Sequence, residues 1–582
     1  MCGIAGIVGC QPLDAPERER LTAMLRALRH RGPDHSGLFQ PDPKVLLGHD
    51  RLAIIDLDPR ANQPMQRGPL CITYNGEIYN YRELRAEMRA QGVEFSTESD
   101  TEVLLAAYET WGEADFLERL DGMFAFALFD GRSGGKLLLA RDRLGKKPLY
   151  YSESYGRITF ASEVRAFREA GDWSKPEFDR EAVMQLVEYR FSSRLSPFTS
   201  VSELAPGHCL SFELASGRRE DKEYFSLSGL VDEAEWTRLD AAAEVDLIDE
   251  LDGLLGAAVE KRLIADVPVS SINSGGIDSS LISAMAARHG ALEMFHMDVE
   301  NDSERVFAEQ MAAQLRLPLT VCSFSDADFL AGFRRTVQAL EFPLIHPNNV
   351  AVMLLAQRIH ESGYKVVLGG EVADELFGGY PHQIRLLTAQ RDPRVMASVR
   401  FLHRLASGRA GVTARKVLIK TRHPVLSQKS VSNFTALDCV HVREYEELLG
   451  RYAFVADQTE REFAAACLFD LGHYVRPLLM RGDKLLMASS VEQRLPFADP
   501  QVMRFAMNLP SRHRLDKKLL RQVARRYLPA AVIDRPKNGF RVGSPVAAQK
   551  ARKHGLSGDE MLTLDSLQIL AQEYAARRSD KA

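Results

Sequence analysis

The sequence lacks the features of several classes of protein. Its 582 residues include seven cysteines, an odd number without a C-x-x-C pair, so we expect neither a disulfide framework nor a zinc site. No run approaches the roughly 18 apolar residues that a membrane-spanning helix needs. The net charge of −5 is small and predicts no nucleic-acid or membrane partner. The start, MCGIAGIVG, lacks the basic segment and long apolar core of a signal peptide, so cytoplasmic localisation is predicted.

The composition that remains is typical of a folded protein with more than one domain. Apolar residues make up 45% and charged residues 26%, and the length exceeds that of one typical domain. Residues 1–212 contain short apolar runs bounded by Gly, Asp or Pro, which predict strands. The predicted strands are 3–8, 52–57, 70–74, 124–129 and 136–140, with helices at 18–28 and 101–110. This pattern favours an α+β layered domain.

The spacing of apolar residues in the second half of the sequence differs from that in the first half. Residues 213–240 are polar and acidic and are predicted to link the two domains. From 241 to 582, apolar residues recur at helical spacing, starting with Leu247, Leu251 and Leu255, and helices alternate with short strands. Strands at 267–272, 294–299 and 365–368 and a helix at 279–288 indicate a parallel α/β sheet. Ligands of such sheets bind at the carboxyl ends of the strands.

A basic stretch at 384–424 carries ten Lys or Arg residues and one acid, Asp392. A surface for a polyanion would have this composition. A solvated helical face or an insertion is the interpretation that we favour.

Cys2 is the first residue with a clear chemical use. Removal of the initiator methionine would make it the N-terminal residue, next to its own α-amine. That amine has a pKa near 8 and can act as the general base for the thiol. A nucleophile and its base in one residue form a compact centre for acyl transfer.

Motifs that follow Cys2 resemble those of the class II glutamine amidotransferases. They run in order over about 160 residues: CGIAGIVG (2–9), HRGPD (30–34), HDRLAIIDL (49–57), YNGEIYN (74–80), ESDTE (98–102), RDRLGKKPLYY (141–151) and ASE (161–163). The resemblance implies an N-terminal-nucleophile fold, an αββα sandwich. It also implies that Cys2 attacks the side-chain amide of glutamine and releases ammonia.

The same resemblance assigns roles to five further residues. The Asn75 side-chain amide and the Gly76 backbone N–H would donate to the tetrahedral oxyanion. Arg51 would bind the α-carboxylate of glutamine, because its planar guanidinium fits that group. Asp100 would bind the α-ammonium, and Glu77 matches another position of the glutamine pocket.

A glycine loop, SGGIDSS (274–280), lies between a predicted strand and a helix. No lysine follows it, so it is not a Walker loop. It resembles the pyrophosphate loop of ATP pyrophosphatases, and Ser274, Gly275, Gly276, Asp278 and Ser279 are its candidate ATP contacts. An acid in a phosphate loop is unfavourable unless a cation neutralises it, so Asp278 predicts Mg²⁺.

A second loop, the acidic GGEVADELFGGY (369–380), follows another predicted strand. Asp374 is a candidate second Mg²⁺ ligand, and Glu371 is an acid that could orient or deprotonate an amine. A helix N-terminus decorated with stabilising acids is the simpler alternative.

The segment 250–545 as a whole resembles the synthetase domain of glutamine-dependent asparagine synthetases. Supporting motifs are DKLLMASSVEQRLPFAD (483–499), KKLLR (517–521) and RPKNGF (535–540). The resemblance makes Lys517 the lysine of the adenylation transition state, with Lys518 as a rival one residue away. It also places Ile272, Gly370 and Met297 at the adenosine pocket.

The resemblance implies a reaction at two sites. ATP activates a carboxylate, normally that of aspartate, as an acyl-adenylate and releases pyrophosphate; ammonia from the Cys2 site then displaces AMP. The expected partners are glutamine, ATP with Mg²⁺ and aspartate, without nucleic acid or membrane, and a homodimer is left open.

The sequence departs from the family pattern in the second half. The acidic loop usually reads S/T-G-E-G-[AS]-D-E, whereas Gly369 and Val372 stand at its first and fourth positions here. Val372 is unfavourable if that position needs a positive φ. Ser271 and Asn273 precede the phosphate loop where the family commonly has LLSGG. Segment 341–350 places Phe342 and His346 where acids are common, and we expect these changes near the acceptor and nucleotide pockets.

These departures leave alternatives open. An amidotransferase of specialised metabolism would act on a carboxylate other than aspartate, and a catalytically dead binding protein would activate none. Two other classes are disfavoured. A ring-closing β-lactam synthetase has no use for the nucleophile Cys2, and a sugar isomerase fused to the same glutaminase would lack both loops of the second half.

Overall fold

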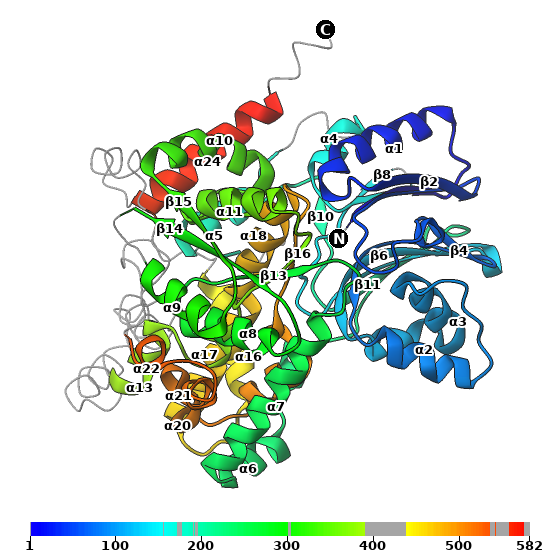
Figure 1. The fold of residues 1–582 in the computed structure, drawn as a ribbon. Helices are drawn as coiled ribbons and strands as arrows, with labels where there is room; N and C mark the ends of the chain where they lie inside the picture. Colours follow the sequence, from blue (N-terminus) through cyan, green and yellow to red (C-terminus); the bar gives the residue numbers. More distant parts are fainter. Residues whose placement is uncertain are drawn as a thin grey trace, which may run out of the picture.

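The computed structural model describes residues 2–154, 156–171, 177–189, 191–192, 196–300, 304–389, 438–535, 542 and 558–575. Two units of different construction lie side by side (Figure 1). Antiparallel sheets form the N-terminal unit, drawn in blue and cyan, and a parallel sheet among helices forms the C-terminal unit.

Two six-stranded sheets are the framework of the N-terminal unit as described. The first has the order β10-β8-β9-β1-β3-β2 and the second β12-β11-β7-β6-β5-β4. The strands of the first are β1 (Gly3–Gly9), β2 (His35–Asp42), β3 (Val45–Arg51), β8 (Tyr150–Ser154), β9 (Arg157–Ala161) and β10 (Ser202–Glu203). Those of the second are β4 (Met65–Arg67), β5 (Leu70–Ile78), β6 (Gly122–Asp130), β7 (Lys136–Arg141), β11 (His208–Glu213) and β12 (Arg219–Glu223).

Alternation along the strands determines how the two sheets pack. On β1, Ile4 and Val8 belong to an apolar core shared with the second sheet, whereas Ala5 and Ile7 pack with helix α1. The second sheet likewise packs its other face against α2 and α3. The helices are α1 (Ala15–Leu28), η1 (Arg29–Arg31), α2 (Tyr81–Ala90), α3 (Asp100–Arg119), α4 (Arg165–Glu169) and α5 (Arg180–Tyr189).

Most elements predicted in this unit are confirmed, but the strand expected at 52–57 is wrong. Strand β3 ends at Arg51, and the residues after it form a loop. The Arg51 guanidinium donates to the carbonyls of Ile55, Asp56 and Asp58, so a side chain satisfies backbone groups that a neighbouring strand would otherwise pair. Asp56 has a φ of 52°, which also interrupts an extended backbone.

Residues 213–240, predicted as a link, carry regular structure. β12 pairs antiparallel with β11 and so extends the second sheet of the N-terminal unit. η4 (Leu227–Leu230) and α6 (Glu233–Ala241) follow and lead into the C-terminal unit.

The C-terminal unit contains a five-stranded parallel sheet of order β15-β14-β13-β16-β17. Its strands are β13 (Val269–Ile272), β14 (Glu293–Val299), β15 (Leu319–Phe324), β16 (Val366–Leu368) and β17 (Glu492–Arg494). The direction of strand order changes between β13 and β16, and this is the point at which α/β sheets bind ligands. The strands and helices predicted from the sequence in this unit are confirmed.

Helices cover both faces of the parallel sheet (Figure 1). The α-helices described in this unit after α6 are α7 (Glu244–Arg262), α8 (Ile277–Ala287), α9 (Arg305–Leu315), α10 (Asp326–Leu340), α11 (Asn349–Glu361), α12 (Ala373–Leu376), α13 (Pro381–Ala389), α16 (Asp438–Arg451), α17 (Gln458–His473), α18 (Val475–Met487), α19 (Pro500–Met507), α20 (Ser511–Arg514), α21 (Lys518–Ala524), α22 (Ala530–Ile533) and α24 (Gly558–Ala575). In the described part of the chain, none has the length and apolar character to span a membrane. The basic stretch at 384–424 lies mostly outside the described residues.

Candidate active sites

Cys2 is buried at the start of β1, where the two sheets of the N-terminal unit approach each other. Its backbone N–H donates to Asn75 Oδ1 on β5 at 2.9 Å, a bond that joins the first sheet to the second. Burial raises the pKa of the Cys2 thiol, so the neutral form is favoured until a base removes the proton.

The Asn75 side chain is oriented as an oxyanion donor requires. Because Oδ1 accepts from Cys2, the amide is turned so that Nδ2 is the remaining donor, and that buried atom has no hydrogen-bond partner among the described residues. Gly76 follows, and a Cβ there would lie 2.2 Å from the Met123 carbonyl oxygen, so only glycine fits. An unpaired buried donor on the side chain that binds the Cys2 N–H suits an anion that forms during the reaction.

The glutamine-pocket candidates gather around the same strand. Asp100, the first residue of α3, accepts from the Tyr74 hydroxyl at 2.9 Å and from the Ile78 N–H at 3.1 Å. Glu77 lies 3.3 Å from Arg494 Nη2 of the C-terminal unit. Burial raises the pKa of both carboxyls, and the nearby Glu492 raises that of Glu77 further.

Arg51 is buried and organises the loop described above. Its Nη1 donates to Asn62 Oδ1 at 2.8 Å, in addition to its bonds to backbone carbonyls. The structure therefore shows Arg51 holding residues 55–62 in place. A role in binding a carboxylate stays a prediction.

A second site lies at the carboxyl ends of β13 and β16. A cavity of about 310 Å³ opens there, at the predicted ligand-binding edge. It is lined by most of the predicted residues of this half: Ile272, Ser274, Gly276, Asp278, Ser279, Met297, Gly370, Glu371, Asp374 and Lys517. Gly275 shapes the loop instead, with a φ of 75° and an N–H that donates to Asn273 Oδ1 at 2.7 Å.

Lys517 joins the two acidic loops. Its Nζ lies 2.5 Å from Asp278 Oδ2 and 2.6 Å from Asp374 Oδ1. Although burial lowers the pKa of this lysine, the two carboxylates outweigh burial and hold it above its usual range. Lys518 pairs with Glu244 at 2.8 Å and is exposed, so the geometry places Lys517 in the cavity rather than its neighbour.

The donor set fits Mg²⁺. Asp278 and Asp374 stand in the first turns of α8 and α12, which follow the adjacent parallel strands β13 and β16. Both reach one cationic nitrogen, so their carboxylates converge. Mg²⁺ is commonly held by one or two carboxylates together with phosphate oxygens of the substrate. These two residues would therefore hold the ion together with a bound triphosphate.

Two departures from the family pattern have structural consequences. Val372 adopts a φ of 80°, so the condition under which a β-branched residue is unfavourable is met. Phe342 packs in the apolar core beside β1 and α1 and does not line the cavity of the second site. Within 341–350, the residue that lines the cavity is Asn348.

Several lining residues were not predicted from the sequence: His296, Glu304, Arg481, Gln493 and Arg535. Asn273, one of the departures expected near these pockets, also lines the cavity. Gln493 and Arg535 stand inside motifs that had been recognised, but the motifs did not indicate where these side chains point. His296 lies on β14 and contacts Asn273 through its Nδ1 at 2.8 Å. Alternation along a short buried strand is the signal that could have found it.

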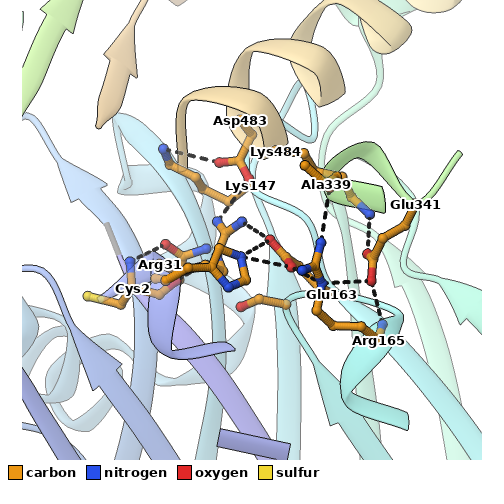
Figure 2. Close-up of polar contacts among 12 residues, drawn as sticks. Cys2, Arg31, Lys147, Glu163, Arg165, Ala339, Glu341, Asp483 and Lys484 are labelled. Carbon is orange, nitrogen blue, oxygen red and sulfur yellow. Dashed lines mark hydrogen bonds and ion pairs between the residues drawn. The ribbon is translucent and has the colours of Figure 1, made fainter. Parts of the chain in front are cut away.

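A buried network of charges connects the two units (Figure 2). Arg31 donates from Nε to the Cys2 carbonyl at 3.1 Å, and its guanidinium also pairs with Glu163 and with Asp483 of α18, each at 2.8 Å. The Arg31 and Asp483 side chains are fully buried, so α18 is tied to the segment that carries the nucleophile.

The network continues along the interface, and positively and negatively charged side chains alternate in it. Arg165 lies 2.9 Å from Glu163 and 3.1 Å from Glu341, and Lys484 lies 2.6 Å from Glu341 (Figure 2). Burial alone would raise the pKa of Glu163, but His30, Arg165 and Arg31 hold it well below its usual range.

Comparisons with known proteins identify both halves. A family model described as "Glutamine amidotransferase domain" matches residues 1–225, and one described as "Asparagine synthase" matches residues 250–578. The fold and the two sites thus define a class: a glutamine amidotransferase joined to a synthase in one chain.

Curated relatives narrow this class. Asparagine synthetase (glutamine-hydrolyzing) 1 of Bacillus subtilis is 31% identical, covering 93% of this chain and 87% of its own length. A putative asparagine synthetase (glutamine-hydrolyzing) of Mycobacterium bovis is 31% identical, covering 97% and 89%. The chain belongs to the glutamine-hydrolysing asparagine synthetase family and is an enzyme of that type, which confirms the resemblance found in its sequence.

Among solved structures, a glutamine phosphoribosylpyrophosphate amidotransferase of B. subtilis overlaps 55% of this chain and 65% of its own. The identity is 20% and the TM-score 0.30, which is too low to support an argument about the fold.

Proposed function

We propose that this chain converts aspartate to asparagine, with glutamine as nitrogen donor and ATP as the activating substrate. The observation that carries the proposal is Lys517, held between Asp278 and Asp374 at the ligand-binding edge of a parallel sheet. The same chain carries the buried Cys2 with an unpaired amide donor beside it. A ligase that hydrolyses glutamine needs both sets of groups.

At the first site, Cys2 attacks the side-chain amide of glutamine once its α-amine has taken the thiol proton. The oxyanion that forms is stabilised by Asn75 Nδ2 and the Gly76 N–H. Asp100 and Arg51 bind the α-ammonium and α-carboxylate of glutamine, and Glu77 completes the pocket. Collapse releases ammonia, and water then hydrolyses the thioester to glutamate.

At the second site, the loop of Ser274, Gly275, Gly276 and Ser279 holds the phosphates of ATP, with the adenosine against Ile272, Met297 and Gly370. Mg²⁺, when bound, neutralises phosphate charge, and Asp278 and Asp374 are the residues that would hold it. Lys517 stabilises the charge that develops as the aspartate β-carboxylate attacks the α-phosphorus and pyrophosphate leaves. Glu371 then orients ammonia and accepts its surplus proton.

We also propose the finer features of the two domain folds, the metal dependence and the cellular location. We assign residues 1–212 to an N-terminal-nucleophile αββα sandwich and 241–582 to an ATP-pyrophosphatase-type domain with a helical C-terminal part. We expect Mg²⁺ dependence and cytoplasmic localisation, as the sequence predicts, and leave the oligomeric state open.

The test is a measurement of AMP, pyrophosphate and amide with glutamine, ATP, Mg²⁺ and aspartate. We expect the three products in equal amounts. A panel of other small carboxylates should give less AMP than aspartate does. AMP release with another acid but not with aspartate would contradict the proposed acceptor, and no AMP with any acid would contradict the synthetase function.

A further inference from the structure

Strand β17 lies between the two sites and contacts residues of both. It has three residues, and side chains alternate along a strand, so its first and third residues share a face. On that face Arg494 pairs with Glu492 at 2.6 Å and with Glu77 of the glutamine pocket at 3.3 Å. The middle residue, Gln493, lines the cavity of the second site.

Gln493 makes two hydrogen bonds that connect the units. Its Nε2 donates to Glu371 Oε1 at 2.9 Å, and its Oε1 accepts from Lys146 Nζ at 3.0 Å. A carboxylate only accepts and an ammonium only donates, so these partners determine which way the amide is turned. Lys146 belongs to the N-terminal unit, in the turn between β7 and β8.

Lys146 is buried in a mixed electrostatic environment. Burial, followed by the neighbouring Lys147, lowers its pKa to about 8, against the opposing effect of Asp483, Glu371 and Asp142. A buried ammonium needs hydrogen-bond partners, and Gln493 supplies one of them.

Two glycines leave room for this arrangement. A Cβ on Gly482 would lie 2.1 Å from Gln493 Oε1, and a Cβ on Gly369 would lie 2.7 Å from Gln493 Nε2 and 2.3 Å from Glu371 Oε2. Gly369 stands where the family pattern has Ser or Thr. The missing side chain therefore coincides with the space that the amide and the carboxylate occupy.

We propose that Gln493 and Lys146 are positioning residues for Glu371: the Gln493 amide orients the carboxylate, and Lys146 of the glutaminase unit orients the amide. The inference rests on the proposed role of Glu371 in amide formation. In that step the ammonia nitrogen forms a bond to the acyl carbon, the C–O bond to AMP breaks, and Glu371 accepts the surplus proton. A carboxylate held at one oxygen by Gln493 keeps a fixed direction toward the cavity.

The consequence concerns how the adenylate is divided between products. If Glu371 is not oriented, adenylation can continue while ammonia attack becomes slower, and water then hydrolyses more of the adenylate. The measurable quantity is the ratio of asparagine to pyrophosphate, with glutamine or with ammonium as nitrogen source. A general loss of folded enzyme lowers both products and leaves this ratio unchanged.

The main test is Gln493→Leu, which keeps the approximate volume and removes both hydrogen bonds. We expect the asparagine-to-pyrophosphate ratio to fall by about tenfold, because small displacements of a reacting group cost large factors in rate. Glutaminase turnover and the KM for ATP should stay within about twofold of the wild type. Lys146→Met should lower the ratio in the same direction by a smaller factor.

Lys261→Met is the matched control for Lys146→Met. Lys261, on α7, also pairs across the two units, with Asp121 at 2.7 Å, and it has no place in either proposed site. We expect the ratio to be unchanged in this variant. Gly482→Ala should resemble Gln493→Leu, because its methyl group occupies the position of the amide oxygen.

A pH profile separates positioning from packing. As pH rises through about 8, Lys146 loses its charge, so the wild-type ratio with glutamine should decline. Lys146→Arg, which stays protonated, should remove that decline. A decline that persists in Lys146→Arg would contradict the role of Lys146.

The remaining outcomes are distinguishable. An unchanged ratio in Gln493→Leu, or a parallel loss of both products, would overturn the positioning role. Absence of AMP from the wild type would instead refute the proposed function. A normal ratio in Glu371→Gln would refute the role of Glu371 itself.

Discussion

Single side chains in both sites are oriented by partners that occupy one of their polar atoms. Asn75 Oδ1 is bound by the Cys2 N–H, which leaves Nδ2 as the donor, and Gln493 is turned by Lys146 and Glu371 in the same manner. An amide has a donor and an acceptor end, so one bond decides what the other end can do.

Asn75→Ala tests this orientation at the first site. Loss of one oxyanion donor should lower glutaminase kcat by about 10²–10³-fold, with little change in the KM for glutamine. Amide formation from ammonium salts should be retained. Steady-state glutamate release with and without ammonium measures both, and an unchanged kcat would contradict the assignment of Asn75 Nδ2.

Lys517→Met and Lys518→Met form a matched pair at the second site. The first removes the ammonium that lies between Asp278 and Asp374, and AMP formation should fall by at least about 10²-fold. The second removes an exposed pair with Glu244 and should change little. Pyrophosphate release measures both, with circular dichroism as the check on folding. Equal losses in the two variants would contradict the choice of Lys517.

At the scale of elements, short strands place reactive groups because their side chains alternate and their ends meet. The carboxyl ends of β13 and β16 bring Asp278 and Asp374 together, and β17 presents Arg494 to one site and Gln493 to the other. The loop at 55–62 shows the opposite case, since Arg51 satisfies its carbonyls and a sheet partner is not needed.

We also expect stability to depend on pH through Glu492 of strand β17. Burial opposes ionisation of Glu492, but Arg494 and Lys147 lower its pKa to about 2. The folded pKa is depressed from 4.5, so this contribution is present above pH 4.5 and is lost as pH falls toward 2. The difference corresponds to about 3 kcal/mol.

Urea unfolding at pH 5 and pH 2.5 measures this effect. The wild type should lose about 2 kcal/mol more than Glu492→Gln over that interval, because the amide does not titrate and most of the effect falls between these two pH values. Parallel losses in the two proteins would show that Glu492 does not carry the dependence.

At the scale of the whole molecule, the two units share a buried charged interface. Arg31 contacts Cys2 on one side and Asp483 of α18 on the other, and a chain of ion pairs continues to Lys484 (Figure 2). Removing one member of a buried network leaves an uncompensated charge, which is strongly unfavourable. The network therefore favours one arrangement of the two units.

The division of labour between the units is tested by Cys2→Ala. This variant should lose glutamine-dependent asparagine formation by at least about 10³-fold, because the nucleophile is absent. Asparagine formation from ammonium salts should stay within about twofold of the wild type. Loss of both activities would contradict two separable sites.

Much of this organisation could be predicted from the sequence. Apolar periodicity indicated the strands and helices of both halves, because burial of one face leaves a pattern that needs no knowledge of the partner. Ordered motifs indicated Cys2, Asn75, Asp278 and Asp374. The prediction of a strand at 52–57 was wrong because the Arg51 side chain hydrogen-bonds the backbone carbonyls of this segment. Apolar periodicity carries no information about such a contact.

The sequence by itself determined which residues are candidates for the chemistry, because nucleophile, carboxylates and glycine loops stand in fixed local spacings. The tertiary structure alone decided which of these residues meet. Arg31 and Asp483 are separated by 452 positions, and Lys146 and Gln493 by 347. A hydrogen bond depends on distance in space, and only the packing of the two units brings those pairs within 3 Å. The connection between the sites is therefore a property of the fold.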